Sequence, residues 1–189
     1  MTQPARLVIF GRQGAGKGTQ CDRIVKHFGV IHLSTGDMFR AARDAGTELG
    51  QRVGPIMQAG GLVPDELTID IVRERLAQAD VQEGGFVLDG FPRTPGQAEA
   101  LLEMLGEQSL TAVINLDVPL DEVTARMKGR GRADDTEEGI AKRLALYDQE
   151  TVPTINWLAE RGYVVNVDGL GTEDEVFERI RAALAAAAE

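Results

Sequence analysis

The sequence predicts an α/β fold, a doubly wound five-stranded parallel sheet with helices on both faces. Three observations predict it. Short apolar runs alternate with amphipathic stretches, the runs are apolar at neighbouring positions as in strands buried on both faces, and a glycine-rich loop directly follows the first run. This βαβα order is typical of doubly wound sheets. The five predicted strands span 7–10, 31–33, 86–88, 112–116 and 163–167.

The first strand leads into a loop that is suited to phosphate. Its residues are Gly11-Arg12-Gln13-Gly14-Ala15-Gly16-Lys17-Gly18-Thr19, and a helix is expected to begin near Gly16 or Lys17. Glycines let several backbone N–H groups point at one anion, and the helix N-terminus and the lysine add positive charge. The commonest such pattern has Ser or Thr directly after the lysine, whereas here Gly18 intervenes before Thr19.

A helical insert is expected over residues 34–63, between the second and third strands. It begins with the capping residues Ser34-Thr35-Gly36-Asp37 and closes with Gly60-Gly61. Pro64 then opens a further helix, with Asp65 and Glu66 in its first turn.

The third strand is followed by Asp89-Gly90-Phe91-Pro92-Arg93. Ligands of open α/β sheets bind at the carboxyl ends of the strands, so Asp89 is expected beside the phosphate loop. An acid there can hold Mg²⁺ directly or through its waters, while a helix cap or a loop salt bridge is the alternative role. Arg93 either grips a phosphate or lies solvated on the surface.

A polar segment, residues 129–135, is expected to form a flap beside the phosphate loop, as is the insert at residues 34–63. Arg126 and Arg130 are four apart and share a helix face if the helix extends that far, and Arg132 and Arg143 follow. Such like charges repel one another unless they bind an anion or pair with nearby acids, of which there are three: Asp134, Asp135 and Glu137. Further on, Pro153 is expected to break or kink the helix that spans residues 140–155.

Composition excludes several classes of protein. The 189 residues suit one domain, and the net charge of −10 argues against a general nucleic-acid binder. No apolar run approaches the length of a membrane span, and the N-terminus lacks a signal-peptide core, so a cytoplasmic location is expected. Cys21 is the only cysteine and His27 and His32 are the only histidines, which precludes an intrachain disulfide and a Cys-rich zinc site.

Four motifs, in order along nearly the whole chain, resemble those of the adenylate kinase family. They are the loop at 11–19, Ser34-Thr35-Gly36-Asp37-Met38-Phe39-Arg40, Asp89-Gly90-Phe91-Pro92-Arg93-Thr94 with Gln97, and Gly129-Arg130-Gly131-Arg132-Ala133-Asp134-Asp135. The resemblance implies a single kinase domain with a sheet of the P-loop NTPase type, an NMP-binding insert at 34–63 and a short lid at 129–135. It implies reversible transfer from ATP·Mg²⁺ to AMP, giving two ADP, in nucleotide homeostasis and purine nucleotide salvage, by a monomer.

The resemblance also implies a role for each matching residue. The catalytic residues would be Lys17, Asp89, Arg93, Arg132 and Arg143. ATP would be bound by Gly14, Ala15, Gly16, Lys17, Gly18, Thr19, Arg126, Arg130 and Gly171. AMP would be bound by Thr35, Arg40, Gly61, Leu62, Val63, Gly90, Phe91, Pro92, Arg93, Gln97, Arg132 and Arg143. Mg²⁺ would be held through water near Asp89 and Thr19, and no zinc is expected.

Two departures and two alternatives accompany the resemblance. Gln13 stands where many members have proline, and one residue separates Arg130 from Arg132, so the longer inserted lid is absent.

A pyrimidine nucleoside monophosphate kinase is the first alternative. Gln97, whose amide can match adenine N6 and N1, and Thr35 favour AMP instead. The second alternative is a nucleotide-binding module without turnover. The residues that argue against it are Lys17, Asp89, Arg93, Arg132 and Arg143, because a protein that only binds nucleotides does not need the arginines that serve transfer.

Overall fold

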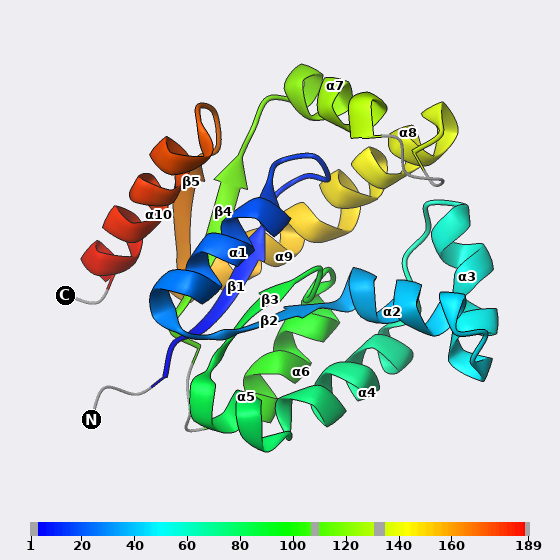
Figure 1. Cartoon of the computed structure of the whole chain (residues 1–189), viewed down its shortest axis with the longest axis horizontal. Helices are drawn as coiled ribbons and strands as arrows, with labels where there is room; N and C mark the ends of the chain where they lie inside the picture. The colour runs from blue at the N-terminus through cyan, green and yellow to red at the C-terminus, as the bar shows by residue number, and fades with distance from the viewer. Residues whose placement is uncertain (1–3, 107–109, 131–134, 188–189) are drawn as a thin grey trace.

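The structure, a computed structural model, describes residues 4–106, 110–130 and 135–187. Its centre is a five-stranded sheet in the order β2-β3-β1-β4-β5, and every neighbouring pair is parallel (Figure 1). The strands are β1 (Arg6–Phe10), β2 (Ile31–Ser34), β3 (Phe86–Asp89), β4 (Ala112–Asp117) and β5 (Val164–Asp168). The predicted fold class is confirmed, and the predicted strands differ from the observed ones by a residue or two at their ends.

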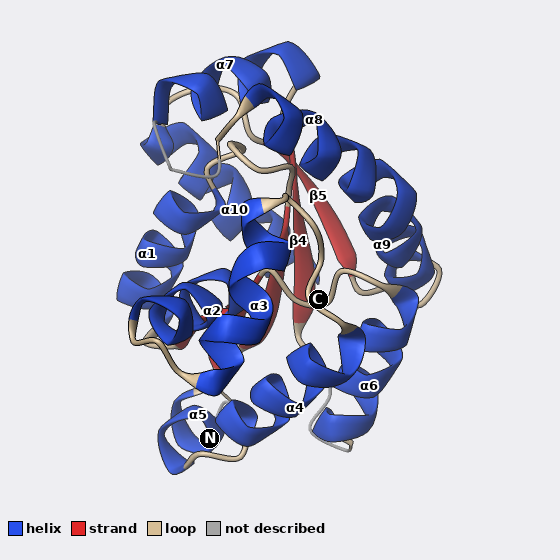
Figure 2. Cartoon of the chain, turned by 90° about the vertical axis from the view of Figure 1, so that its right-hand side faces the viewer, coloured by secondary structure: helices blue, strands red, loops and turns tan. Residues whose placement is uncertain are grey.

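Helices cover both faces of the sheet (Figure 2). Leu7 and Ile9 of β1 pack into a core with α1 (Lys17–Phe28), α7 (Leu120–Arg130) and α10 (Glu173–Ala187). Val8 and Phe10, which alternate with them, pack on the opposite face against α4 (Asp65–Leu76), α6 (Pro95–Leu105) and α9 (Val152–Ala159). Both sides of each central strand are therefore buried, which explains why the runs are apolar throughout.

The insert between β2 and α4 packs around a small core that it shares with the start of α4. It contains α2 (Thr35–Asp44) and α3 (Glu48–Gln58), which lie beyond the end of β2 and away from the sheet (Figure 1). Ser34 caps α2 as the sequence predicts, because its side chain accepts a hydrogen bond from the Asp37 N–H at 3.2 Å. Phe39, Val53 and Val63 pack together between these helices and the start of α4. A short helix, α5 (Ala79–Gly84), precedes β3.

The helix predicted around Pro153 is modified rather than broken. α8 (Glu137–Leu146) passes into a π-helical turn, η1 (Tyr147–Thr151), and continues as α9 with Pro153 in its first turn. Proline lacks the N–H that would close an α-helical bond and its ring crowds the carbonyl four residues back, and the wider turn just before it accommodates both effects. Within the described ranges, no helix combines the length and apolar character needed to cross a membrane.

Candidate active site

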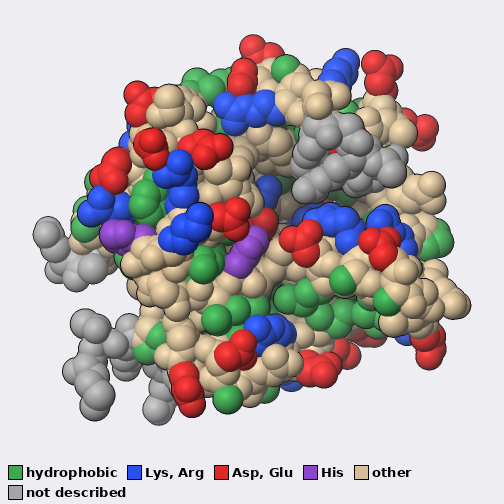
Figure 3. Space-filling model, viewed as in Figure 1, with side chains coloured by type: hydrophobic (Ala, Val, Ile, Leu, Met, Phe, Trp, Pro, Cys, Tyr) green, Lys and Arg blue, Asp and Glu red, His purple; other side chains and the backbone are tan. Residues whose placement is uncertain are grey.

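A cavity of about 580 Å³ opens at the carboxyl edge of the sheet, between the phosphate loop, the insert and the α8–η1 segment. Figure 3 shows basic side chains around the hollow on this face. Most of the site residues predicted from the sequence meet here, although they come from segments far apart in the chain. Those that line the cavity are Gly14, Gly16, Lys17, Gly18, Thr19, Thr35, Arg40, Gly61, Leu62, Val63, Asp89, Gly90, Pro92, Arg93, Gln97, Arg126 and Arg143.

Other predicted site residues lie elsewhere. Ala15 and Phe91 are packed in the core at 3% and 1% exposure and are not among the cavity's lining residues. Gly171 lies in the β5–α10 loop, also apart from the lining. Arg130 is the last residue of α7, but its side chain is not described, and Arg132 lies outside the described residues together with residues 131, 133 and 134 of the expected lid.

The phosphate loop has the backbone shape that its glycines allow. Gly14 and Gly16 have φ of 89° and 95°, values that other residues rarely adopt. A Cβ on Gly14 would also lie 2.7 Å from the Val123 carbonyl oxygen of α7, so the loop and that helix approach too closely for a side chain. α1 begins at Lys17 as predicted, and the Lys17 Nζ donates to the Gly11 carbonyl at 2.9 Å.

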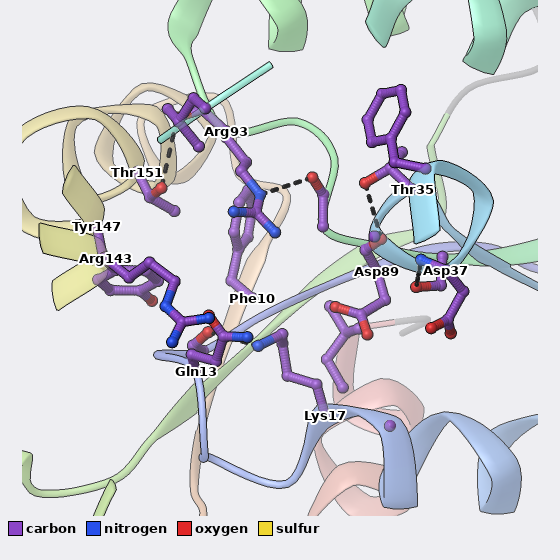
Figure 4. Close-up of a pocket in the computed structure, with 18 of the residues that line it drawn as sticks. Phe10, Gln13, Lys17, Thr35, Asp37, Asp89, Arg93, Arg143, Tyr147 and Thr151 are labelled. Carbon is purple, nitrogen blue, oxygen red and sulfur yellow. Dashed lines mark hydrogen bonds between the residues drawn. The ribbon is translucent and has the colours of Figure 1, made fainter. Parts of the chain in front are cut away.

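Three arginines approach one another across the cavity. Arg93, on the loop after β3, donates from Nε to the Gly90 carbonyl at 2.9 Å. Burial lowers the pKa of the Arg93 guanidinium, the negative charge of Asp89 opposes that shift, and the positive charges of Arg40 and Arg143 add to it. Figure 4 shows Lys17, Asp89, Arg93 and Arg143 converging on the same space from different elements. The arrangement suits a ligand that carries several negative charges.

Arg143, on α8, pairs with an acid of the expected lid segment. Its Nη2 donates to Asp135 Oδ1 at 2.9 Å and its Nε to the Gly139 carbonyl at 3.2 Å, and the two charged side chains are only 10% and 2% exposed. Arg126 of α7 pairs with Glu122 at 2.7 Å and reaches the Gly14 carbonyl at 3.5 Å. The predicted pairing of these arginines with nearby acids is therefore confirmed for Arg143 and Asp135.

The far side of the cavity combines apolar surface with a few fixed polar groups. Thr35 and Gln97 are each 2% exposed. The Thr35 hydroxyl donates to the Asp89 carbonyl at 3.5 Å (Figure 4). Both side chains line the cavity beside Leu62 and Val63, so a planar ring could be enclosed there with polar atoms at its edge.

Several lining residues carried no functional signal in the sequence. Tyr147 fits only the apolar helical pattern, yet it lines the cavity from η1, and burial raises its pKa to about 12 while the charge of Arg12 opposes that shift. Arg12 itself ties the phosphate loop to η1, because its guanidinium lies 2.7 Å from Asp148 and 5.2 Å from the Tyr147 ring centroid. Met57, Thr68 and Thr151 also line the cavity without such a signal, whereas Phe39, another lining residue, belongs to the motif at 34–40.

The donor set at the loop suits a hard cation better than a soft one. Cys21, His32 and Asp89 offer ligand atoms within 4.8 Å of one another. Cys21 is 0% exposed, and burial, with a contribution from Asp89, raises the pKa of its thiol and so disfavours the thiolate that a soft metal would bind. Asp89 and Thr19, both on the cavity wall, present oxygen, the donor that Mg²⁺ prefers.

Comparisons with known proteins agree on one family. A family model described as "Adenylate kinase" matches residues 9–163. A protein named adenylate kinase from Clavibacter michiganensis subsp. michiganensis is 51% identical, over 95% of this chain and 92% of its own length. One from Phocaeicola vulgatus is 47% identical, over 94% and 97%, and one from Stenotrophomonas maltophilia is 44% identical, over 95% and 98%.

Proposed function

Because this chain belongs to the adenylate kinase family, we propose that its cavity holds ATP and AMP with their phosphates meeting between Lys17, Arg93 and Arg143. The protein is a nucleoside monophosphate kinase. It transfers a phosphoryl group reversibly between ATP and AMP, giving two ADP, and its general role is nucleotide homeostasis.

One observation carries the assignment of the phosphate site. Lys17, Arg40, Arg93 and Arg143 line the same cavity, and Arg40 and Arg143 are close enough to disfavour the charge on Arg93. Gathering like charges in a partly buried space costs free energy unless an anion compensates for them. Asp37 and Asp135 supply part of that compensation by pairing with Arg40 and Arg143, and the phosphates of two nucleotides would supply the rest, because the arginines offer planar forks that match phosphate oxygens.

The two nucleotides would occupy opposite ends of the cavity. The loop glycines, Lys17 and Thr19 would hold the ATP phosphates, Arg126 and Arg130 would serve the same nucleotide, and the Gly171 backbone would contact its adenine. AMP would lie between the insert and the loop after β3, contacted chiefly by Thr35, Leu62, Val63 and Gln97, with Arg40 and Arg93 on its phosphate. The side chains on both walls that support this division line one continuous cavity.

Transfer in this site needs alignment and charge stabilisation rather than a base. The attacking oxygen of AMP is already ionised near neutral pH, so no proton has to be removed. Lys17, Arg93 and Arg143 would hold donor and acceptor phosphates in line and stabilise the charge that spreads over the transferred group. Arg132, outside the described residues, would join them. Enclosure by the insert would exclude water that otherwise hydrolyses ATP.

Asp89 and Thr19 would hold Mg²⁺, through its water shell at Asp89, and the ion when bound would neutralise phosphate charge. We expect activity to stop when Mg²⁺ is removed with EDTA and to return when it is restored in excess. A chelator selective for zinc should leave activity unchanged. Stoichiometric, tightly held zinc in the purified protein would contradict the second expectation.

Residues 34–63 would act as the NMP-binding insert and residues 129–135 as a short lid, on a protein that works as a cytoplasmic monomer. The small cluster of Phe39, Val53 and Val63 lies apart from the two cores on the sheet and reaches only α4 outside the insert, which supports movement of the insert against α4. Light scattering coupled to size-exclusion chromatography would test the monomer, and fractionation of the source cells would test the location.

A coupled assay of ADP formation tests the assignment, with ATP as donor and AMP, CMP, UMP or GMP as acceptor. AMP should have the highest kcat/KM. Turnover of CMP or UMP above that of AMP would favour the pyrimidine kinase, and nucleotide binding without turnover would indicate the binding module. Arg143→Ala should lower kcat by at least about 10²-fold. Arg161→Ala is the matched control, because Arg161 stacks on Trp157 of α9 outside the cavity lining.

A further inference from the structure

A carboxylate on α4 holds the side chain assigned to the acceptor base. Asp65, the first residue of α4, accepts hydrogen bonds from Gln97 Nε2 at 2.8 Å and from Thr94 Oγ1 at 2.8 Å. The other end of the Gln97 amide is held as well, because Oε1 accepts the Arg93 backbone N–H at 2.8 Å. Gln97 is thus tied at both ends while it lines the cavity.

These two bonds specify which end of the amide is oxygen and which is nitrogen. An ionised carboxylate only accepts hydrogen bonds, and a backbone N–H only donates them. The reversed amide would turn its carbonyl oxygen toward Asp65 and its NH₂ group toward the Arg93 N–H, which leaves both contacts unfavourable. The N-terminus of α4 supports the negative charge that enforces this choice.

The tied amide keeps hydrogen-bonding capacity for a ligand. An amide has two N–H donors and two carbonyl lone pairs, and the protein uses one of each. The remaining donor and acceptor match adenine, whose edge presents an N6 donor beside an N1 acceptor. Hypoxanthine and guanine present the reverse, an O6 acceptor beside an N1 donor, so they require the reversed amide.

We propose that Asp65 is a positioning residue that sets acceptor specificity: by holding Gln97 Nε2, it fixes the amide in the orientation that accepts adenine and rejects 6-oxopurines. This inference rests on the proposed placement of AMP against Gln97. Asp65 acts through Gln97 and is not itself among the residues that line the cavity.

The test compares AMP with IMP as acceptors and follows the ratio of their kcat/KM values. The two share ribose and phosphate, so general damage to the fold, to the ATP site or to the phosphate clamps cancels in the ratio. Asp65→Ala removes the acceptor and should lower the ratio at least about tenfold, within the range for one unpaired polar group. Asp65→Asn, which keeps the shape and replaces a charge-assisted bond with a neutral one, should lower it by about fivefold.

Matched variants separate the possible failures. Asp70→Ala removes an exposed carboxylate from the same helix, one paired with Arg73, and should leave the ratio unchanged. Gln97→Leu should lower the ratio by itself, and Asp65→Ala should lower it no further in that background. If Gln97→Leu lowers the ratio but both Asp65 variants stay within twofold of wild type, the inference about Asp65 is overturned and the AMP site stands. If Gln97→Leu leaves the ratio unchanged, the placement of adenine against Gln97 is itself wrong.

Discussion

At the scale of single residues, three cationic side chains of the candidate site are oriented by hydrogen bonds within the protein. Lys17 is bonded to the Gly11 carbonyl, Arg93 to the Gly90 carbonyl, and Arg143 to Asp135. Such pre-organisation lowers the cost of orienting the cations when phosphates bind. It also implies an exchange of partners, since the acid that pairs with Arg143 must yield to phosphate if that arginine is to clamp it.

Lys17→Met should nearly abolish transfer while the fold survives. Methionine keeps much of the length of the side chain but removes the positive charge that Lys17 places at the N-terminus of α1. Loss of such an electrostatic donor costs about 10²–10³-fold in kcat or more. Lys26→Met, an exposed position on the same helix, is the control and should retain full activity. A Lys17→Met enzyme with half the wild-type kcat would refute the role given to the lysine.

Cys21 should make stability depend on alkaline pH. Burial raises the pKa of its thiol in the folded state, so above about pH 9 the unfolded chain loses this proton while the folded chain keeps it. The stabilisation is therefore complete below the unfolded pKa and is lost as the pH rises above it, by about 1.4 kcal/mol per pH unit.

Urea unfolding of wild type and Cys21→Ala at a series of pH values checks this expectation. The difference between their unfolding free energies should be constant from pH 7 to 8 and should shrink above pH 9. A difference that stays constant up to pH 10.5 would contradict the assignment.

At the scale of elements, the insert meets α8 through two glycines. Gly60, with φ of 71°, ends the insert, and a Cβ there would lie 2.9 Å from the Gly139 carbonyl oxygen of α8. This contact joins the insert, which we propose to bind AMP, to α8, which carries Arg143. This close approach, and not backbone flexibility alone, explains why glycine occupies the turn.

Gly60→Ala should impair catalysis more than it impairs folding. The left-handed backbone costs a non-glycine residue about 1–2 kcal/mol, and the added methyl also pushes the insert away from α8. Gly46→Ala provides the matched control, because Gly46 has φ of 65° in the same insert but open space around its Cβ position.

Thermal unfolding and steady-state kinetics with AMP would be measured for both variants. Both variants should lose stability, Gly60→Ala more because of the close contact with α8, and only Gly60→Ala should show a raised KM for AMP. Equal kinetic effects in the two variants would show that the contact with α8 is unimportant.

At the scale of the whole molecule, the central sheet and the insert at residues 34–63 differ in how extensively they are packed against the rest of the protein. The central strands are buried on both faces, whereas α2 and α3 lie away from the sheet (Figure 1) and pack mainly on each other, with a small core that they share with α4. An element held by few contacts outside itself can move with little loss of packing. We therefore expect ligand-dependent motion to concentrate in the insert.

A bisubstrate mimic that joins two adenosines through phosphates should slow hydrogen exchange strongly in residues 34–63 and in the first turn of α8. The phosphates draw Arg40 and Arg143 toward the loop and close the insert over the cavity. The C-terminal half of α10 serves as the internal reference and should not change. Protection confined to residues 11–19 would show that the insert does not close.

Features that depend on neighbouring residues could be predicted from the amino-acid sequence alone. Apolar runs specified the strands, the glycines and Lys17 specified the phosphate loop, and Ser34 specified the start of α2, because each rests on backbone preferences and caps within a few positions. The ends of parallel strands meet at one edge, so Asp89 and the loop could also be placed together in advance. The course of the chain through Pro153 was harder to predict, since a π-helical turn depends on how the whole helix packs.

Contacts between side chains that are distant in the sequence became visible only in the folded chain. Arg12 pairs with Asp148 across 136 positions, Gln97 is held by Asp65 across 32, and Gly60 meets Gly139. No local pattern encodes these pairs, because they arise from the strand order β2-β3-β1-β4-β5 and from helices packing onto it. The residues proposed to bind phosphate could be identified one by one from local motifs, whereas the contact that holds the Gln97 amide involves Asp65 on another helix.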